Sequence, residues 1–177
     1  MSYTPEKNGT AKVISLLAIL VACVLMATTF LQVPYRVLWQ IGALIFYIFS
    51  FELLYRYVLT TYTYAIDGEN FIVHKKAGKK QIYVCNVSMK TAIALVKTPH
   101  GKAERAATAE QFGRVGIRYN YCQIVAPKDA YSYFFEFNGK VAEVVFQPNE
   151  SMREKILEIL RQVKESAASG ETNEDAT

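Results

Sequence analysis

The sequence predicts a membrane α-helical hairpin followed by a mainly β domain, and two observations support this prediction. Residues 13–59 are rich in Leu, Ile, Val, Ala and Phe, with a Pro-Tyr-Arg break at 34–36. Residues 60–148 instead alternate apolar and polar side chains in short runs separated by Asp-Gly and Asn-Gly turns, which is typical of antiparallel strands. We expect a mobile polar arm, a transmembrane hairpin, a β domain and a disordered acidic tail at residues 1–12, 13–59, 60–165 and 166–177.

The first apolar run, Val13 to Val33, contains 21 residues and no charge. At 1.5 Å per residue a helix of this length spans about 31 Å, which matches the hydrocarbon thickness of a bilayer. The run is too long for the apolar core of a cleaved signal peptide, and no clear small-x-small cleavage site precedes the next apolar run. It therefore predicts an uncleaved transmembrane helix.

The second apolar run begins at Val37 and reaches about Leu59 if Glu52 and Arg56 are tolerated. These two residues lie four apart on one helical face, near the end of the span, where long side chains reach the headgroups. Glu52 is either half of an interfacial ion pair with Arg56 or an intramembrane carboxylate that handles protons or ions. The ion pair is the expected role.

Basic residues predict the orientation of the hairpin. Lys7 and Lys12 precede the first span, Arg56 and several lysines follow the second, and the connecting turn has only Arg36. Because cytoplasmic flanks of membrane helices carry an excess of Lys and Arg, both termini are expected in the cytoplasm. The chain is then a multi-pass protein of the cell membrane.

Seven strands and one helix are predicted after the hairpin. The strands are expected at residues 60–66, 70–76, 81–86, 92–97, 114–125, 131–137 and 140–146. Residues 98–113 are alanine-rich and charged, and are either a helical turn or a loose loop. An apolar stripe at helical spacing, preceded by the capping box Ser151-x-x-Glu154, predicts a helix over 151–165 that closes the sheet.

This order of elements resembles a pleckstrin-homology-like (PH-like) fold, in which the last helix plugs a bent, partly open seven-stranded barrel. The stretches that carry the resemblance are residues 62–70, 137–140 and 146–150. The chain is similar to bacterial membrane proteins with a two-helix transmembrane hairpin and a C-terminal PH-like domain. The resemblance implies a binding role and no active site. Eukaryotic phosphoinositide-binding relatives have basic residues in the first hairpin turn, whereas Asp67-Gly68-Glu69 is acidic, which argues against that type of recognition.

A basic turn is the first candidate site. The first strand leaves the membrane and the second returns to it, so the next turn is expected at the headgroups. Its lysines are Lys75, Lys76, Lys79 and Lys80. Each lysine beside an anionic membrane contributes about 1 kcal/mol of attraction. This turn either contacts lipid headgroups or is an ordinary solvated hairpin.

A cluster of four tyrosines and one arginine suggests a second candidate site, either a peptide-binding groove at a sheet edge or part of the core. Its residues are Arg118, Tyr119, Tyr121, Tyr131 and Tyr133.

The sequence shows no catalytic signature. It has no nucleophile elbow and no glycine-rich phosphate loop, and its three cysteines and two histidines have no metal-ligand spacing. We expect no cofactor, no metal and no nucleic-acid partner. The predicted function is a non-enzymatic, membrane-anchored binding or scaffold protein at the cytoplasmic face, with anionic lipids or an unknown protein as partner. The alternative is an accessory subunit whose hairpin packs with other transmembrane helices.

Overall fold

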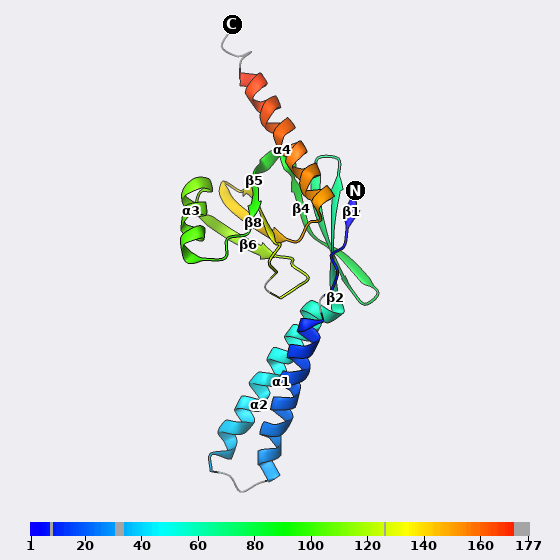
Figure 1. Ribbon diagram of the computed structural model, residues 1–177, viewed down its shortest axis with the longest axis vertical. Coiled ribbons are helices and arrows are strands. Elements are labelled where there is room, and N and C mark those ends of the chain that lie inside the picture. Colours follow the sequence, from blue (N-terminus) through cyan, green and yellow to red (C-terminus); the bar gives the residue numbers. More distant parts are fainter. Residues whose placement is uncertain (8, 31–33, 126, 172–177) are drawn as a thin grey trace.

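Two apolar helices form a hairpin that projects from the rest of the chain (Figure 1). The computed structural model describes residues 1–7, 9–30, 34–125 and 127–171. Helix α1 covers Thr10–Ala27 and is followed by a 3₁₀ turn, η1 (Thr28–Phe30); α2 covers Arg36–Leu53 and continues as a π-helix, η2 (Leu54–Leu59). Both helical segments are long and apolar enough to cross a membrane by length and composition. The last residues of the predicted first span, 31–33, lie outside the described residues.

Small residues form the contact between the two helices. They recur at helical spacing on α1 and face small residues of α2; the buried members are Ala11, Ser15, Ala18, Ala22, Ala43 and Ser50. The Ser50 hydroxyl donates a hydrogen bond of 2.8 Å to the Ser15 carbonyl oxygen. Large apolar side chains point outward instead, with Leu16 69% and Phe51 70% exposed. The hairpin thus buries its small residues and exposes its large ones.

The first sheet has four strands in the order β1-β2-β3-β4, all antiparallel. They are β1 (Ser2–Tyr3), β2 (Thr60–Asp67), β3 (Asn70–Ala77) and β4 (Lys80–Ser88). The N-terminal arm, expected to be mobile, instead supplies β1, and the Met1 carbonyl oxygen accepts a hydrogen bond of 2.8 Å from the Ile66 amide. That prediction failed because a two-residue edge strand has no periodicity to detect.

The second sheet has four strands in the order β5-β7-β8-β6. They are β5 (Ala92–Lys97), β6 (Val115–Asn120), β7 (Tyr131–Phe137) and β8 (Lys140–Phe146). A short turn, η3 (Met89–Thr91), connects the sheets, and the region 98–113 contains a true helix, α3 (Lys102–Phe112). Strand β6 pairs with β8 in parallel, whereas the other pairs in this sheet are antiparallel.

The two sheets do not close into the predicted seven-stranded barrel. No strand pair joins them among the described residues. Part of the reason lies in β6, which was predicted to continue to Val125 but ends at Asn120. There the Asn120 side-chain oxygen accepts a 3.0 Å hydrogen bond from the Cys122 amide and turns the chain out of the sheet.

The core lies between the sheets and under helix α4 (Glu150–Glu171). Phe71 and Phe146 have ring centroids 4.9 Å apart, and Met152 and Ile156 of α4 are fully buried in the same cluster.

Two details of α4 differ from expectation. Asn149 caps the helix by accepting a 3.0 Å hydrogen bond from the Met152 amide, so the helix begins before Ser151. It also extends six residues beyond 165, into the tail predicted to be disordered; residues 172–177 lie outside the described part.

A buried glutamine joins the hairpin to the β domain. Gln123 is 1% exposed, and its side-chain nitrogen donates to the carbonyl oxygens of Tyr57 (3.2 Å) and Thr60 (2.9 Å). Its side-chain oxygen accepts the Tyr62 amide at 3.0 Å, while its own amide donates to the Gln147 side-chain oxygen at 2.8 Å. The end of the π-helix, the start of β2 and the segment after β8 are therefore held by one residue.

The same network continues into the core through a buried tyrosine. The Gln147 amide donates to the Tyr64 hydroxyl at 3.3 Å, and that hydroxyl donates to the Tyr121 carbonyl oxygen at 2.8 Å. Burial raises the pKa of Tyr64 well above its usual value, so the phenol stays neutral and able to donate. These hydrogen bonds pair the main-chain amides and carbonyl oxygens at the junction, whereas the Thr60 hydroxyl is buried without a partner.

Replacing this glutamine tests the junction. Gln123→Met keeps the length of the side chain and removes its hydrogen bonds, leaving the Tyr62 amide and the Thr60 carbonyl buried and unpaired. We expect the free energy of unfolding of the full chain in detergent to fall by about 2–4 kcal/mol. Gln111→Met, on the exposed face of α3, is the matched control and is expected to change it by less than about 0.5 kcal/mol. Equal unfolding midpoints for the two variants would contradict the assigned role.

Candidate functional site

The turn between β3 and β4 lies beside the end of the helical hairpin. The register places Ala77, at the end of β3, opposite Thr60, the first residue after the π-helix. Gly78 has a φ of 60°, the left-handed conformation that this tight turn requires. A hollow of about 400 Å³ beside the turn is lined by Lys76, Gly78 and Leu59, together with threonines at positions 4, 61 and 63. The strand pairing thus puts the predicted basic turn at the level where the hairpin ends.

The four lysines of this turn are available to a ligand. Lys76, Lys79 and Lys80 are exposed, and Lys75 is half-buried with its ammonium 5.2 Å from the centre of the Tyr55 ring. None of the four forms an ion pair with a described residue. Their contact with lipid headgroups stays a prediction.

Arg56 has a different partner from the one expected. Its guanidinium donates a 3.1 Å hydrogen bond to the Asn120 carbonyl oxygen and lies 5.3 Å from the centre of the Tyr57 ring. An ion pair with Glu52, which is exposed, is not found among the described residues. Residues four apart lie on one face only in an α-helix. Here the chain becomes a π-helix at Leu54, between Glu52 and Arg56, so the two side chains no longer lie on the same face.

Lys7 belongs to the same basic end of the molecule. Its ammonium donates a 2.6 Å hydrogen bond to the Val58 carbonyl oxygen at the end of the π-helix. From the sequence, Lys7 served only to predict the orientation of the hairpin, because no local pattern shows that the N-terminal arm folds back along β2. The structure therefore gathers basic residues from three separate segments at the hairpin end.

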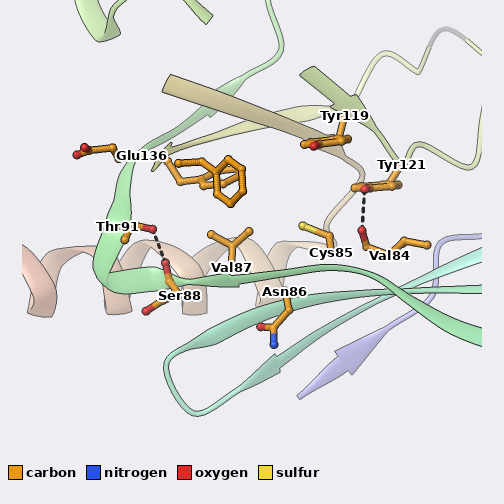
Figure 2. A pocket seen from close by; sticks show the side chains of 11 residues that line it. Val84, Cys85, Asn86, Val87, Ser88, Thr91, Tyr119, Tyr121 and Glu136 are labelled. Carbon is orange, nitrogen blue, oxygen red and sulfur yellow. Dashed lines mark hydrogen bonds between the residues drawn. The ribbon is translucent and has the colours of Figure 1, made fainter. Parts of the chain in front are cut away.

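A groove between the two sheets is the second candidate site (Figure 2). It has a volume of about 380 Å³ and is lined by Val84–Ser88 of β4, by Tyr119 and Tyr121, and by Phe135–Phe137 of β7. Cys85 and Val87 point toward the tyrosines, whereas Asn86 points away (Figure 2). At one end the Tyr121 hydroxyl donates a 3.1 Å hydrogen bond to the Val84 carbonyl oxygen.

The structure divides the aromatic cluster that the sequence suggested. Tyr119 and Tyr121 stack in parallel, 6.1 Å apart, along the groove, but Tyr133 is fully buried in the core. Tyr131 accepts a 3.0 Å hydrogen bond from Arg153 of α4, and Arg118 forms a 3.2 Å ion pair with the buried carboxylate of Glu143. Only two of the five predicted residues therefore line the groove.

Sequence reasoning missed the opposite wall of the groove. Val84–Ser88 read as ordinary strand residues, because nothing in the sequence shows that β4 is the last strand of its sheet. The uncharged run 81–89, which contains the exposed Ile82 and Tyr83, is the one signal that could have indicated it. A protected edge strand usually has a charge or a proline in such a run.

The thiols of the domain are not activated nucleophiles. Burial raises the pKa of Cys85 to about 11 and that of Cys122 to about 12, in the second case despite the opposing charges of Arg56 and Arg118. The described residues also contain no group of three His, Cys, Asp or Glu side chains that could hold a metal ion.

The raised pKa values predict slow alkylation. At pH 8 the thiolate fraction of Cys85 is expected to be about 100-fold below that of a thiol with the ordinary pKa of 9.0, since each unit lowers it tenfold. Iodoacetamide labelling of the full chain in detergent, read by peptide mass spectrometry, measures this, and rates in denaturant provide the control. A native rate for Cys85 close to the denatured rate would contradict the burial of its thiol.

Comparison with known proteins agrees with this architecture. A family model described as bacterial PH-like domain (DUF6106) matches residues 4–165, which include the hairpin and every strand of the two sheets except β1. No curated protein and no solved structure shows a significant match. The predicted resemblance is confirmed, and the chain belongs to the bacterial PH-like domain family DUF6106.

Proposed function

We propose that this protein is a non-enzymatic, membrane-anchored binding or scaffold protein that holds its PH-like domain at the cytoplasmic face of the cell membrane. Membership of a PH-like family supports a binding role, because the domain is generally a recognition fold without catalytic residues. The groove and the basic turn are the two surfaces on which such binding would depend.

The outward face of the hairpin is the observation that supports anchoring most strongly. Large apolar side chains cover its outside, while the small residues Ala18, Ala22 and Ala43 are buried between the helices. In water this distribution would be costly, since each large apolar side chain left exposed forgoes about 1.5–3 kcal/mol of burial. In a bilayer, where lipid covers the outside and small residues allow close helix contact, it is the expected one.

The charges support the orientation. The ends of both helices nearest the domain carry Lys7, Lys12 and Arg56, and the turn at the opposite end of the hairpin carries Arg36. Because α1 and α2 are antiparallel, the N-terminus and the domain lie at the same end (Figure 1). The excess of positive charge at that end supports a cytoplasmic location for it.

The basic turn would fix the tilt of the domain on the bilayer. The pairing of Ala77 with Thr60 places the turn beside the last residue of the hairpin, where anionic headgroups would lie. Attraction there falls off over about 8–10 Å at physiological salt, so the contact requires this proximity. The lysines Lys76, Lys79 and Lys80 are exposed and free of carboxylate partners among the described residues, which supports a headgroup role.

A hollow in the hairpin is compatible with the second candidate function, an accessory subunit of a membrane complex. It measures about 600 Å³, lies near the connecting turn, and is almost wholly apolar. Its lining residues are Val21, Leu25, Pro34, Tyr35, Leu38, Trp39, Gly42 and Phe46. A side chain of another transmembrane helix would fill it as well as a lipid chain, and co-purification with another membrane protein in mild detergent would favour the subunit.

Anchoring predicts resistance to extraction. When cell membranes are washed with alkaline carbonate, the full chain is expected to stay in the pellet, because two lipid-covered helices cannot leave the bilayer without exposing their apolar surface. Release into the supernatant together with a peripheral marker protein would contradict the anchoring.

Neutralising the basic turn tests the headgroup contact. The full chain, with Cys23→Ala to remove the exposed thiol of the hairpin, is placed in nanodiscs with a fluorophore on Ala77→Cys. The introduced thiol reacts selectively because burial raises the pKa of the two domain thiols, Cys85 and Cys122. We expect quenching by headgroup-nitroxide lipid to be stronger in anionic than in zwitterionic nanodiscs. The variant K75Q/K76Q/K79Q/K80Q should reduce it to the zwitterionic level, since about 1 kcal/mol of attraction per lysine is removed.

The matched control replaces four exposed lysines elsewhere, as K97Q/K102Q/K140Q/K164Q. It changes the net charge equally and should leave the quenching unchanged. Equal effects of the two variants would show that only the overall charge matters, and would contradict the headgroup contact of this turn.

A further inference from the structure

Two strand edges face the groove without a partner. Strand β4 is the last strand of the first sheet and β6 is the last strand of the second, and each is paired on one side only among the described residues. An unpaired edge presents a row of amide and carbonyl groups that can pair with another extended chain. The groove lies where these two edges leave the domain open.

The edge of β4 has little protection against pairing. Its nine residues include charge only at Lys80, at the hairpin end. A β-bulge opposite Val73 and His74 interrupts the middle of the edge, and the Val84 carbonyl oxygen there already accepts from Tyr121, so the residues after Val84 are the ones open to pairing. Ile82 is 54% and Tyr83 is 72% exposed beside it. Natural edges of this length usually carry an inward charge or a proline, so the apolar character of β4 points to a partner.

The other wall of the groove offers rigid anchors for side chains. Tyr119 and Tyr121 are held parallel, within 3° of one another, and the Tyr121 hydroxyl is fixed to the Val84 carbonyl oxygen. Tyrosine loses little conformational freedom when it binds, and buried aromatic anchors dominate the energetics of many interfaces. A side chain of a segment bound beside β4 would contact these two rings (Figure 2).

The charge of the groove limits what it can accept. Glu136 is the one charged residue in its lining; it is exposed and has no ion-pair partner among the described residues. An anionic headgroup or an acidic segment would be repelled, while a lysine or arginine would be attracted. The end of the groove at Glu136, whose carboxylate points away from the tyrosines (Figure 2), is thus complementary to a single basic residue, and the rest of the groove is complementary to apolar side chains.

We propose that the groove binds an extended segment of a partner protein, which adds as a strand to the free edge of β4, places alternate apolar side chains against Tyr119 and Tyr121, and pairs a basic residue with Glu136. This inference rests on the scaffold role proposed above and names its partner by chemistry. Main-chain pairing supplies the affinity in this mode, and the pockets for alternate side chains supply the specificity.

Selection of peptides tests the proposal. The probe is a displayed library of random linear peptides, selected on the full chain in zwitterionic nanodiscs and counter-selected on the double variant Y119S/E136K. We expect the enriched peptides to alternate apolar residues and to include Lys or Arg. A synthetic enriched peptide should slow hydrogen exchange at the outward-facing amides among residues 82–88 by at least about tenfold, because an added strand bonds the amides that do not already pair with β3.

Charge exchange provides the decisive comparison. Glu136→Lys should weaken the peptide about tenfold or more, and a peptide with its basic residue replaced by Glu should recover the loss. Glu110→Lys, on exposed α3, is the matched control and should bind like the parent. The proposal is overturned if no peptide discriminates the double variant, if residues 82–88 gain no protection, or if two copies of the chain already pair through β4. Because zwitterionic nanodiscs are used, a failure of the headgroup contact does not alter this result.

Discussion

The attachment of the β domain to the hairpin depends on one buried amide. The Gln123 side chain forms hydrogen bonds with one amide and two carbonyl oxygens at the point where a π-helix becomes a strand. The bonds to the Tyr62 amide and the Thr60 carbonyl oxygen are buried. A buried polar group without a partner costs about 1–3 kcal/mol, so these hydrogen bonds stabilise the junction. They also determine how the domain is attached to the hairpin, and therefore where the surfaces of the domain lie relative to it.

The open groove follows from how β6 is connected. After β5 the chain passes through α3 and enters β6, which joins the far side of the second sheet in parallel with β8. The other edge of β6 pairs with no described strand, and neither does the outer edge of β4, so both sheets keep a free edge. Closure of the barrel was expected because strand count and order resemble a closed fold, but pairing partners are decided by contacts between distant residues, which local periodicity does not report.

Local patterns were sufficient for much of the fold. The strand at 131–137 and its partner at 140–146 were predicted to the residue, because alternation and the Asn138-Gly139 turn are local signals. The apolar runs likewise located both helices of the hairpin. The candidate surfaces were harder: the sequence predicted that the basic turn lies at the hairpin end, since strand direction alone places it there, but it could not show that Lys7 folds back to the same end. For the groove it supplied Tyr119 and Tyr121 and missed β4, whose role depends on its being last in a sheet.

The groove and the membrane junction share one short segment of chain. Tyr121 closes the groove through its hydroxyl, its carbonyl oxygen accepts from Tyr64, and Gln123 holds the hairpin two residues later. Strand β4 itself starts beside the basic turn and ends near Glu69, whose carbonyl oxygen accepts the Met89 amide at the opposite end of the domain. The groove therefore runs away from the hairpin end.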